Sequence, residues 1–552
     1  MKTPRSGNTK VTKLEEKTSY YYFGIAETLK KYSIFLSHTE HIKLNVFIDG
    51  VEGDNSTGLV HWPILAKILE IRVNIIFPIA LHTGHSKPKN VETYLRDFTD
   101  EAIRLHTEGV LIKECMREFS IIRILGDAPA RALFLNTVGH NAFGHCVFCN
   151  IWGANLNYRN YFYDNSMLSL ERSSEQFYAV EYPELQKGPT PLMEIQHINL
   201  LEDCPYDPMH MLMRILKTLL GFLTKPEKNK IRKSRAHLYQ MTDGHIDAIS
   251  RRLSGLRAPV EFQKQRLDTF RRNQQWKASL CRFFLLYVGP IFLRGRVSRE
   301  VFRNFLLLHF SFRVLSATNS NPSQMECVRP HLEDFVRTFG EIYGIETIGH
   351  YMHGLLHLVD QAKKHGPLDS YAVYLFESYL GIFKHFKHGP RYPAQQLVNR
   401  IIERQVSSRD IYLQNKRSTI FPDSSQYDGP FPADLRKEDF HTYSRINLEC
   451  CSLNVKRDSD NLILLQSGTI FRVQNILHHR QDNNTFLFGY PLMRKTNMYT
   501  YPESSATVGI FRATDNEVAT YFQEVVLLTD FASKCVCVPL GNEEVAAIRM
   551  LH

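Results

Sequence analysis

The chain has 552 residues and a formal net charge of +10, with 43% hydrophobic and 22% charged residues. This length exceeds one ordinary domain and the composition is too apolar for a disordered chain, so we expect two to four folded units. The opening residues lack the apolar core of a signal peptide, and no stretch reaches about eighteen apolar residues without a charge, which excludes membrane insertion. We therefore expect a soluble protein of the cytosol or the nucleus, and a nuclear one if it acts on DNA.

The ten cysteines are too sparse for a disulfide scaffold and indicate a reducing compartment. Only Cys146 and Cys149 have the two-residue spacer of a metal or redox site.

The positive charge is concentrated in residues 225–282, which contain fifteen Lys or Arg against five Asp or Glu. Such a segment suits a polyanion such as nucleic acid, because each neutralised phosphate releases condensed counterions. The alternative is a solvated helical surface.

The first part of the chain reads as α/β. Residues 41–49 alternate apolar and polar side chains at period two, which predicts a strand that ends at Asp49-Gly50. A second buried strand is expected over 120–126, and Asp127 then caps a helix that begins at Ala128-Pro129. Further strands are expected at 59–60 and 71–77, and a helix at 91–106.

From about residue 155 helical spacing dominates. Helices are expected over 209–223, 276–293, 301–315, 350–364 and 374–385, with a break at 389–393 before one more helix that ends near Glu403. Residues 415–435 read as a linker. Short strands are then expected at 462–465, 469–473, 485–489, 525–528 and 535–538, which indicates a small C-terminal β-barrel or sandwich.

Asp49 and Asp127 each end a strand, where a carboxylate can leave the sheet and meet another. Two converging carboxylates bind hard divalent ions that organise a water or hydroxyl for attack on a phosphodiester. A single aspartate at a strand end is more often a turn or cap residue, so the surrounding motifs decide its interpretation.

Several further motifs lie between about residues 40 and 400. They are Asp49-Gly50, Trp62-Pro63-Ile64, Lys87-Pro88, Gly126-Asp127-Ala128-Pro129-Ala130-Arg131, His140 with Cys146 and Cys149, Asp207-Pro208-Met209-His210, Trp276-Lys277-Ala278, Gly366-Pro367-Leu368-Asp369 and Phe376-Glu377-Ser378-Tyr379-Leu380-Gly381. In these motifs the chain resembles the CACTA (EnSpm) transposases and their animal relatives, within the RNase H-like DDE recombinases that include the Transib and V(D)J recombinases.

The resemblance implies an α/β RNase H-like core that is split by a large all-helical insertion and followed by a small β-rich C-terminal domain. The implied domains are an N-terminal segment (1–39), the first part of the core (40–154), the basic helical insertion (155–345), the second part of the core with the glutamate helix (346–405), a linker (406–435) and the β-rich domain (436–552). Glu377 becomes the third catalytic acid, and Asp49, Asp127 and Glu377 would hold Mg²⁺ or Mn²⁺.

A second group of residues has the composition of a metal-binding site. Two thiolates at the spacing of Cys146 and Cys149 can hold one Zn²⁺, and His353 and His357 lie four apart on one helix face. Similar recombinases carry such a pair of histidines just before the catalytic glutamate, so the resemblance implies a structural zinc that ties the two halves of the core together. The alternatives are a local site that uses His140 or His145, and no bound metal.

Asp207 and Pro208 open a helix as N-cap and first residue. The resemblance gives His210 a catalytic place near the scissile phosphate. The DNA-binding candidates are Arg271, Arg272, Trp276, Lys277 and Arg282. Trp276 is interpreted either as a base-stacking platform or as a core residue. The family usually has an acid two residues after Ala278, where this chain has Leu280, which puts a salt bridge there in doubt.

We therefore expect a DDE transposase that performs metal-dependent DNA cleavage and strand transfer at transposon ends, acting as a homodimer or higher oligomer on DNA. The rival is a domesticated, catalytically inactive nuclear DNA-binding or interaction protein that keeps the fold. An RNase H-like nuclease that acts on RNA or hybrids would differ only in substrate.

Overall fold

The computed structural model describes residues 18–53, 58–69, 71, 73–163, 170–224, 235–262, 269–383, 392–415, 420–422, 426–516 and 521–551. The chain forms two compact units. Unit 1 contains residues 1–211, 345–365 and 370–417, and unit 2 contains 212–344, 366–369 and 418–552. Among the described residues, no helix is long and apolar enough to cross a membrane.

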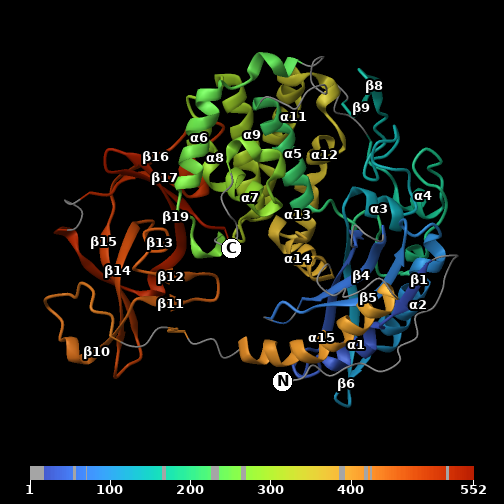
Figure 1. Cartoon of the computed structure of the whole chain (residues 1–552), viewed down its shortest axis with the longest axis horizontal. Coiled ribbons are helices and arrows are strands. Elements are labelled where there is room, and N and C mark those ends of the chain that lie inside the picture. The colour runs from blue at the N-terminus through green and yellow to red at the C-terminus, as the bar shows by residue number, and fades with distance from the viewer. Residues whose placement is uncertain are drawn as a thin grey trace. The chain divides into compact units, whose positions relative to one another are not determined.

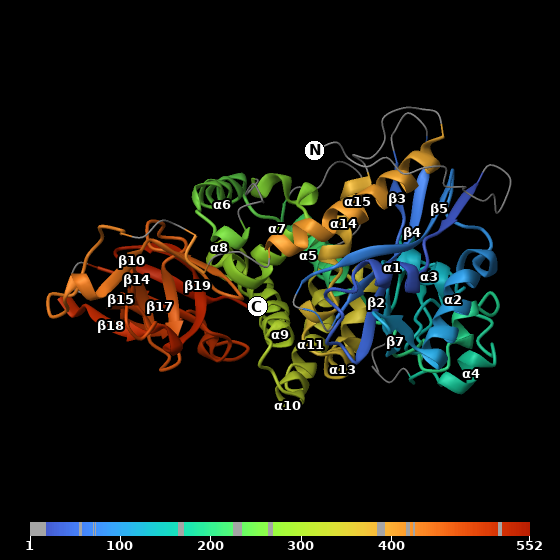
Figure 2. The same ribbon diagram turned by 90° about the horizontal axis from the view of Figure 1, so that it is seen from below.

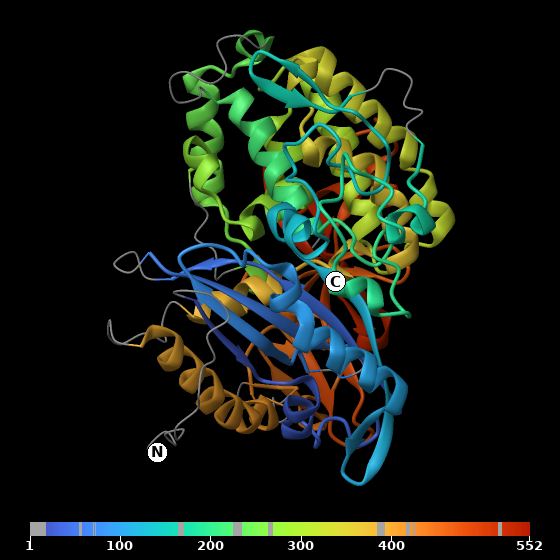
Figure 3. The ribbon, with the colours of Figure 1, turned by 90° about the vertical axis from the view of Figure 1, so that its right-hand side faces the viewer.

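Unit 1 is built on a mixed sheet with the strand order β1-β5-β4-β2-β7-β6, and β3 pairs with β4 (Figure 3). The strands are β1 (Ser19–Tyr22), β2 (His41–Ile48), β3 (Val51–Glu52), β4 (Val60–Ile68), β5 (Ile76–Gly84), β6 (Val110–Ile112) and β7 (Cys115–Leu125). The strand β4 is antiparallel to both β2 and β5, whereas β7 runs parallel to β2. The sheet therefore starts with an antiparallel meander and adds a parallel strand after the helix α2 (Val91–Glu108).

The alternating residues of β2 form the centre of the core. Ile42, Leu44, Val46 and Ile48 are fully buried, as the period-two pattern predicts. The helix α2 begins at the cap Asn90, whose side chain accepts from the amide of Thr93, and packs against β7 and β5. The helices α14 (Tyr374–Phe383) and α15 (Pro393–Asn415) also lie against β5 (Figures 1 and 2).

Several boundaries differ from the expected ones. The sheet already begins at β1, inside the expected N-terminal segment, because Ser19–Tyr22 pair with β5. The strand after β4 occupies 76–84 and not 71–77. The helix α15 continues to Asn415, so the chain is still helical where the linker was expected from 406. The break expected at 389–393 lies mostly outside the described residues.

Residues 155–211 were expected to open the helical block but belong to unit 1. They form the hairpin β8 (Ala154–Leu156) and β9 (Arg159–Tyr161), the short helix α4 (Ser174–Tyr178), the 3₁₀ turn η1 (Pro191–Glu194) and connecting loops. Apolar side chains from these loops, such as Leu185 and Ile198, pack into the sheet core. Prolines at 183, 189, 191 and 205 interrupt regular helix formation here.

The long helices begin with α5 (Pro208–Leu223). The helices of unit 2, long and short, are α6 (Asp243–Gly255), α7 (Ala278–Phe283), the π-helical turn η5 (Phe284–Val288), α8 (Gly289–Leu293), α9 (Arg299–Ser316), α10 (Pro322–Glu326) and α11 (Arg329–Tyr343). The chain then returns to unit 1 through α12 (His350–Gly354), the turn η7 (Leu355–His357) and α13 (Leu358–His365).

The remainder of unit 2 is β-rich. Its main sheet is antiparallel, in the order β16-β17-β20-β19-β13-β14-β15-β18, with β10 paired to β14. The strands are β10 (Phe440–Tyr443), β13 (Leu462–Leu465), β14 (Ile470–His479), β15 (Thr485–Pro491), β16 (Met493–Asn497), β17 (Ile510–Thr514), β18 (Glu524–Leu527), β19 (Phe531–Gly541) and β20 (Glu544–Arg549). All five expected strands overlap strands of this sheet, although residues 469 and 528 lie just outside β14 and β18.

Candidate active site

Asp49 and Asp127 follow the carboxyl ends of two neighbouring parallel strands, β2 and β7. The register pairs Phe47 with Leu125, so both strands end at the same edge of the sheet. Gly126 permits this close approach, because a Cβ there would lie 2.8 Å from the backbone oxygen of Ile48. Any larger residue at 126 would push the two aspartates apart.

A second glycine fixes the turn that carries Asp49. A Cβ on Gly50 would lie 2.6 Å from the indole ring of Trp62, which packs on this backbone from β4. The amide of Gly50 also donates to Oδ1 of Asp49 at 2.6 Å. The sequence motifs Asp49-Gly50 and Trp62-Pro63 thus form one packed feature that orients the first carboxylate.

Glu377 reaches the same edge from α14. The ring of the preceding residue, Phe376, stacks on Phe47 of β2 with centroids 5.0 Å apart. The approach to α14 is held by Asp207, whose Oδ1 accepts from the amide of Val373 at 3.1 Å. These two contacts bring Glu377 to Asp49 across more than 300 residues of sequence.

Side-chain atoms of Asp49, His210 and Glu377 lie within 4.8 Å of one another. Asp49 is 9% exposed, whereas the Glu377 side chain is 33% exposed, so the group is open to solvent on one side. Asp127 is not within this group. Its Oδ1 accepts from the amide of Ala130 at 2.8 Å and caps α3 (Ala128–Phe134), as expected from the sequence.

His210 is oriented by a hydrogen bond from Nδ1 to Oδ2 of Asp207 at 2.7 Å, which leaves Nε2 facing Oε1 of Glu377 at 3.6 Å. Asp207 also accepts from the amides of Met209 and His210 and is almost fully buried. Burial alone would lower the pKa of His210, but Asp207 and the charges of Glu377 and Asp49 raise it to about 9. These carboxylates therefore favour the imidazolium form of His210.

Negative charge is crowded at this site. Burial and the charges of Asp127 and Glu377 raise the pKa of Asp49 well above its ordinary value. Burial raises the pKa of Glu377 as well, and Asp207 and Asp127 add to the effect. Carboxylate oxygens are the ligands that Mg²⁺ and Mn²⁺ prefer, and a divalent cation would relieve this repulsion, so the residues fit such an ion.

A second cluster joins Cys146 and Cys149 to His353 of α12 and His357 of η7. The two sulfurs are 3.6 Å apart, Cys146 Sγ lies 3.5 Å from His357 Nε2, Cys149 Sγ lies 3.3 Å from His353 Nε2, and the two Nε2 atoms are 3.3 Å apart. A tetrahedral zinc ion requires about 3.8 Å between two sulfurs, about 3.6 Å between sulfur and nitrogen and about 3.3 Å between two nitrogens. The four ligand atoms therefore already stand near the corners of a zinc tetrahedron.

The alternative ligands His140 and His145 are not in this group. Burial lowers the pKa of His145 to about 3, and its ring packs on Phe162 at 3.9 Å. For the thiol of Cys146, burial would raise the pKa, but Cys149 and the charges of His357 and His353 bring it well below its ordinary value. A thiolate is the form that binds a metal.

Two buried arginines support this region and were not singled out from the sequence. Arg172 donates Nε to the carbonyl oxygens of Cys146 and Cys149, at 2.9 and 3.1 Å. The guanidinium of Arg131, on α3, lies 3.9 Å from the ring centre of Tyr206. Arg131 therefore connects the helix capped by Asp127 to the segment that carries Asp207. The sequence feature that could have pointed to Arg131 was its place in the motif that begins at Gly126.

Only some of the residues that were predicted to bind DNA are exposed and free of a buried packing role. Trp276 is 2% exposed and packs against Phe270 and Phe284, so in this structure it is a core residue and not a stacking platform. Arg282 is ion-paired with Asp369. Arg271 pairs with Asp243 and Asp247 at the surface, and Arg272 and Lys277 are exposed. The basic residues at 225–234 and 263–268 lie outside the described residues.

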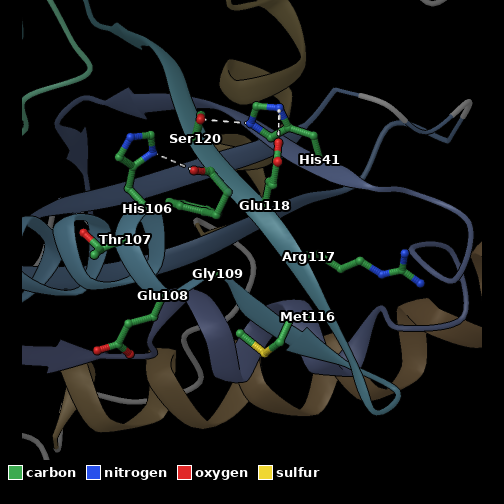
Figure 4. Close-up of a pocket in the computed structure, with 10 residues that line it drawn as sticks. His41, His106, Thr107, Glu108, Gly109, Met116, Arg117, Glu118 and Ser120 are labelled. Carbon is green, nitrogen blue, oxygen red and sulfur yellow. Dashed lines mark hydrogen bonds and ion pairs between the residues drawn. The ribbon is translucent and has the colours of Figure 1, made fainter.

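A separate cavity of about 410 Å³ lies at the other end of β7 (Figure 4). There His41 Nε2 lies 2.9 Å from Ser120 Oγ, and His41 Nδ1 lies 3.5 Å from Glu118. This is the order of a hydrolytic triad, but the amide that follows the serine, at Ile121, already donates to His197. That amide is therefore not free to stabilise an oxyanion, and we interpret the cluster as a structural hydrogen-bond network.

Comparison with known protein families gives a match for the C-terminal part of the chain only. A domain of unknown function, DUF8592, matches residues 425–550, which hold β10 to β20. No curated protein matches the chain. The matched residues lie in unit 2, so the cluster around Asp49 and the Cys/His cluster are outside them.

Proposed function

We propose that this chain is an RNase H-like DDE transposase that uses Mg²⁺ or Mn²⁺ to cleave DNA and to transfer the freed 3′ end to a target. The observation that carries the proposal is the convergence of Asp49, Glu377 and His210, with Asp127 beside them, at one sheet edge. The sheet supports it, because Asp49 and Asp127 follow two neighbouring central strands, β2 and β7, where the resemblance places the two aspartates.

Asp49, Asp127 and Glu377 would hold the cations. When bound, the ions supply an activated water or hydroxyl and stabilise the leaving oxygen. Because Oδ1 of Asp127 caps α3, its second oxygen is the one available as a ligand. Burial, followed by nearby carboxylates, raises the pKa values of Asp49 and Glu377, and a bound cation would favour their charged forms.

His210 has a separate role in this proposal. Its proton on Nδ1 is held by Asp207, so the second proton, on Nε2, points toward the carboxylates. An imidazolium in this position can donate to a phosphate oxygen and neutralise charge that develops there. Asp207 acts through His210 and through Val373, and is a positioning residue.

The Cys/His cluster would hold one structural Zn²⁺. Cys146 and Cys149 precede the insertion of residues 212–344, and His353 and His357 follow it. An ion at this position would therefore tie together two segments of unit 1 that are separated by more than 200 residues.

Exposed basic residues such as Arg272 and Lys277 would add phosphate contacts that are independent of sequence.

The experiment is incubation of the purified chain with labelled DNA that carries the flanking genomic repeats, with Mn²⁺, Mg²⁺ or EDTA. Strand nicks that require the metal support the proposal. Salt-sensitive DNA binding without any nick under these conditions would favour an inactive DNA-binding protein that keeps the fold.

A further inference from the structure

Unit 2 contains a cavity of about 310 Å³ that takes no part in the site described above. Its walls come from α9, α10 and α11 on the helical side and from the turn η10 (Ser505–Val508) and β20 on the β-rich side. Apolar side chains, among them Phe310 and Val314, share the lining with Arg313, Arg549 and His331. This volume lies at the lower end of the range for small-molecule sites.

Arg313 brings an uncompensated charge to this cavity. It is 1% exposed and donates to the carbonyl oxygens of Leu286 at 2.8 Å, Val508 at 2.6 and 3.1 Å, and Arg549 at 2.9 Å. In the part of the chain that the structure describes, no carboxylate pairs with it. Burying an unpaired guanidinium is costly, and an anion in the adjoining cavity would offset that cost.

Two further polar nitrogen atoms along the cavity are unsatisfied. The donor Nε of Arg549 is buried without a hydrogen-bond partner, and so is Nδ1 of His331, which donates or accepts according to the tautomer. Unpaired buried polar atoms of this kind are rare and require an explanation. The cavity lining contains two arginines, Arg313 and Arg549, and one acid, Glu503, which is exposed.

We propose that this cavity binds a small organic anion. One carboxylate or phosphate group would be recognised by Arg549 and His331 in the field of Arg313, and an apolar body would lie against Phe310 and Val314. Arg549 and Glu503 fall within the residues matched by the domain of unknown function, so ligand binding would be shared between that domain and the helices of unit 2. This inference does not depend on the proposed DNA chemistry.

Cys327 provides a direct readout, because it lines the cavity and is exposed as a free thiol. The full chain is treated with iodoacetamide, with and without phenyl phosphate, benzoate or the neutral benzyl alcohol, and alkylation of each cysteine is followed by mass spectrometry. Cys115 and Cys450 are exposed elsewhere and serve as internal controls. We expect phenyl phosphate or benzoate to protect Cys327 alone, and benzyl alcohol to give no protection.

Two variants test whether the positive charge of Arg549 is needed for binding of the anion. Arg549→Met should weaken binding of the protecting anion roughly ten-fold or more in a titration, because a charge-assisted hydrogen bond is lost. Arg480→Met, at an exposed position of the same domain, should leave the affinity unchanged. The proposal is overturned if neither anion protects Cys327 or if benzyl alcohol protects it equally. It is also overturned if Arg549→Met binds as the wild type does, or if short duplex DNA protects Cys327 better than the small anions.

Discussion

Asp49 is nearly buried and lies near two further carboxylates, so its surroundings disfavour the ionised form of its side chain. Its pKa is raised by burial first and then by Asp127 and Glu377. A carboxyl group with a raised folded-state pKa stabilises the protein fully below its unfolded pKa of about 3.9, and this contribution is lost as the pH rises through the folded value. The metal-free protein therefore bears a growing cost as the pH rises above the unfolded pKa.

Asp49→Asn should raise the free energy of unfolding of the metal-free chain at pH 7 by about 1 kcal/mol or more, since one buried charge is removed. Mg²⁺ or Mn²⁺ should stabilise the wild type but not the variant, because an amide does not supply the anionic ligand. Urea denaturation with and without the cation measures both effects. Asp434→Asn, at an exposed position, is the control, and an equal cation effect in wild type and Asp49→Asn would contradict the assignment.

His309 of α9 gives a pH dependence of the opposite sign. Its Nδ1 donates to the carbonyl of Leu285 at 2.6 Å, its Nε2 is buried without a partner, and burial lowers its pKa to about 3. The unfolded chain takes up a proton below about pH 6.5 and the folded chain does not, so stability falls as the pH drops from 6.5 toward 3 by roughly 1.4 kcal/mol per pH unit.

His309→Gln should remove this part of the acid sensitivity, because an amide donates but does not titrate. The measurement is the unfolding free energy at several pH values between 4 and 7. His38→Gln, at an exposed position, should keep the wild-type slope. The same slope in His309→Gln and in the wild type would show that other groups account for the pH dependence.

At the scale of elements, the Cys/His cluster links the segment after α3 to α12 and η7. The purified chain should carry about one tightly bound zinc ion, and both Cys149→Ser and His357→Ala should lose it and lower the unfolding temperature. Elemental analysis by mass spectrometry and thermal denaturation measure these outcomes. His140→Ala should retain the metal, and loss of zinc in that variant instead of in His357→Ala would favour the local site.

A buried ion pair joins the helical and β-rich parts of unit 2. Lys534 Nζ, which is fully buried, lies 2.5 Å from Asp460 and 2.9 Å from Glu261. Lys534→Met should cost roughly 3 kcal/mol in chemical denaturation, because Asp460 then loses its buried cation and keeps only the pair with Arg457 at 3.1 Å. The double variant Lys534→Met with Asp460→Asn should recover part of this loss. Arg512→Met, which breaks an exposed pair with Glu544, should cost about 1 kcal/mol or less, and a similar loss at both sites would contradict the explanation.

Local patterns predicted some of these elements and not others. The strand β2 and the cap at Asp127 follow from residues adjacent in sequence, namely alternating apolar side chains and an aspartate before Ala128-Pro129. The burial of Trp276 could not be seen, because it depends on packing with Phe270 and Phe284 while its neighbours in sequence are basic.

The same limit applies to the candidate site. Asp207 was expected only as a helix cap, whereas it also orients His210 and holds Val373 from a segment 166 residues away. The approach of Glu377 to Asp49 depends on the stack of Phe376 on Phe47. Motif resemblance proposed the residues, but only the folded chain provides these contacts.

At the scale of the whole molecule, unit 1 is formed from segments on both sides of residues 212–344. Asp49, Asp127 and His210 precede that stretch, whereas Glu377 follows it. The candidate site therefore exists only when the returning segment has docked on the sheet. The central claim is that this assembled group of carboxylates cleaves DNA with a divalent cation.

The most direct test is cleavage of labelled repeat-flanked DNA in Mn²⁺ by the wild type and by Asp49→Asn, Asp127→Asn and Glu377→Gln. We predict nicks from the wild type and none from the three variants, while their folding and salt-sensitive DNA binding stay close to those of the wild type. Full cleavage by any one variant, or cleavage by the wild type in EDTA, would contradict the account.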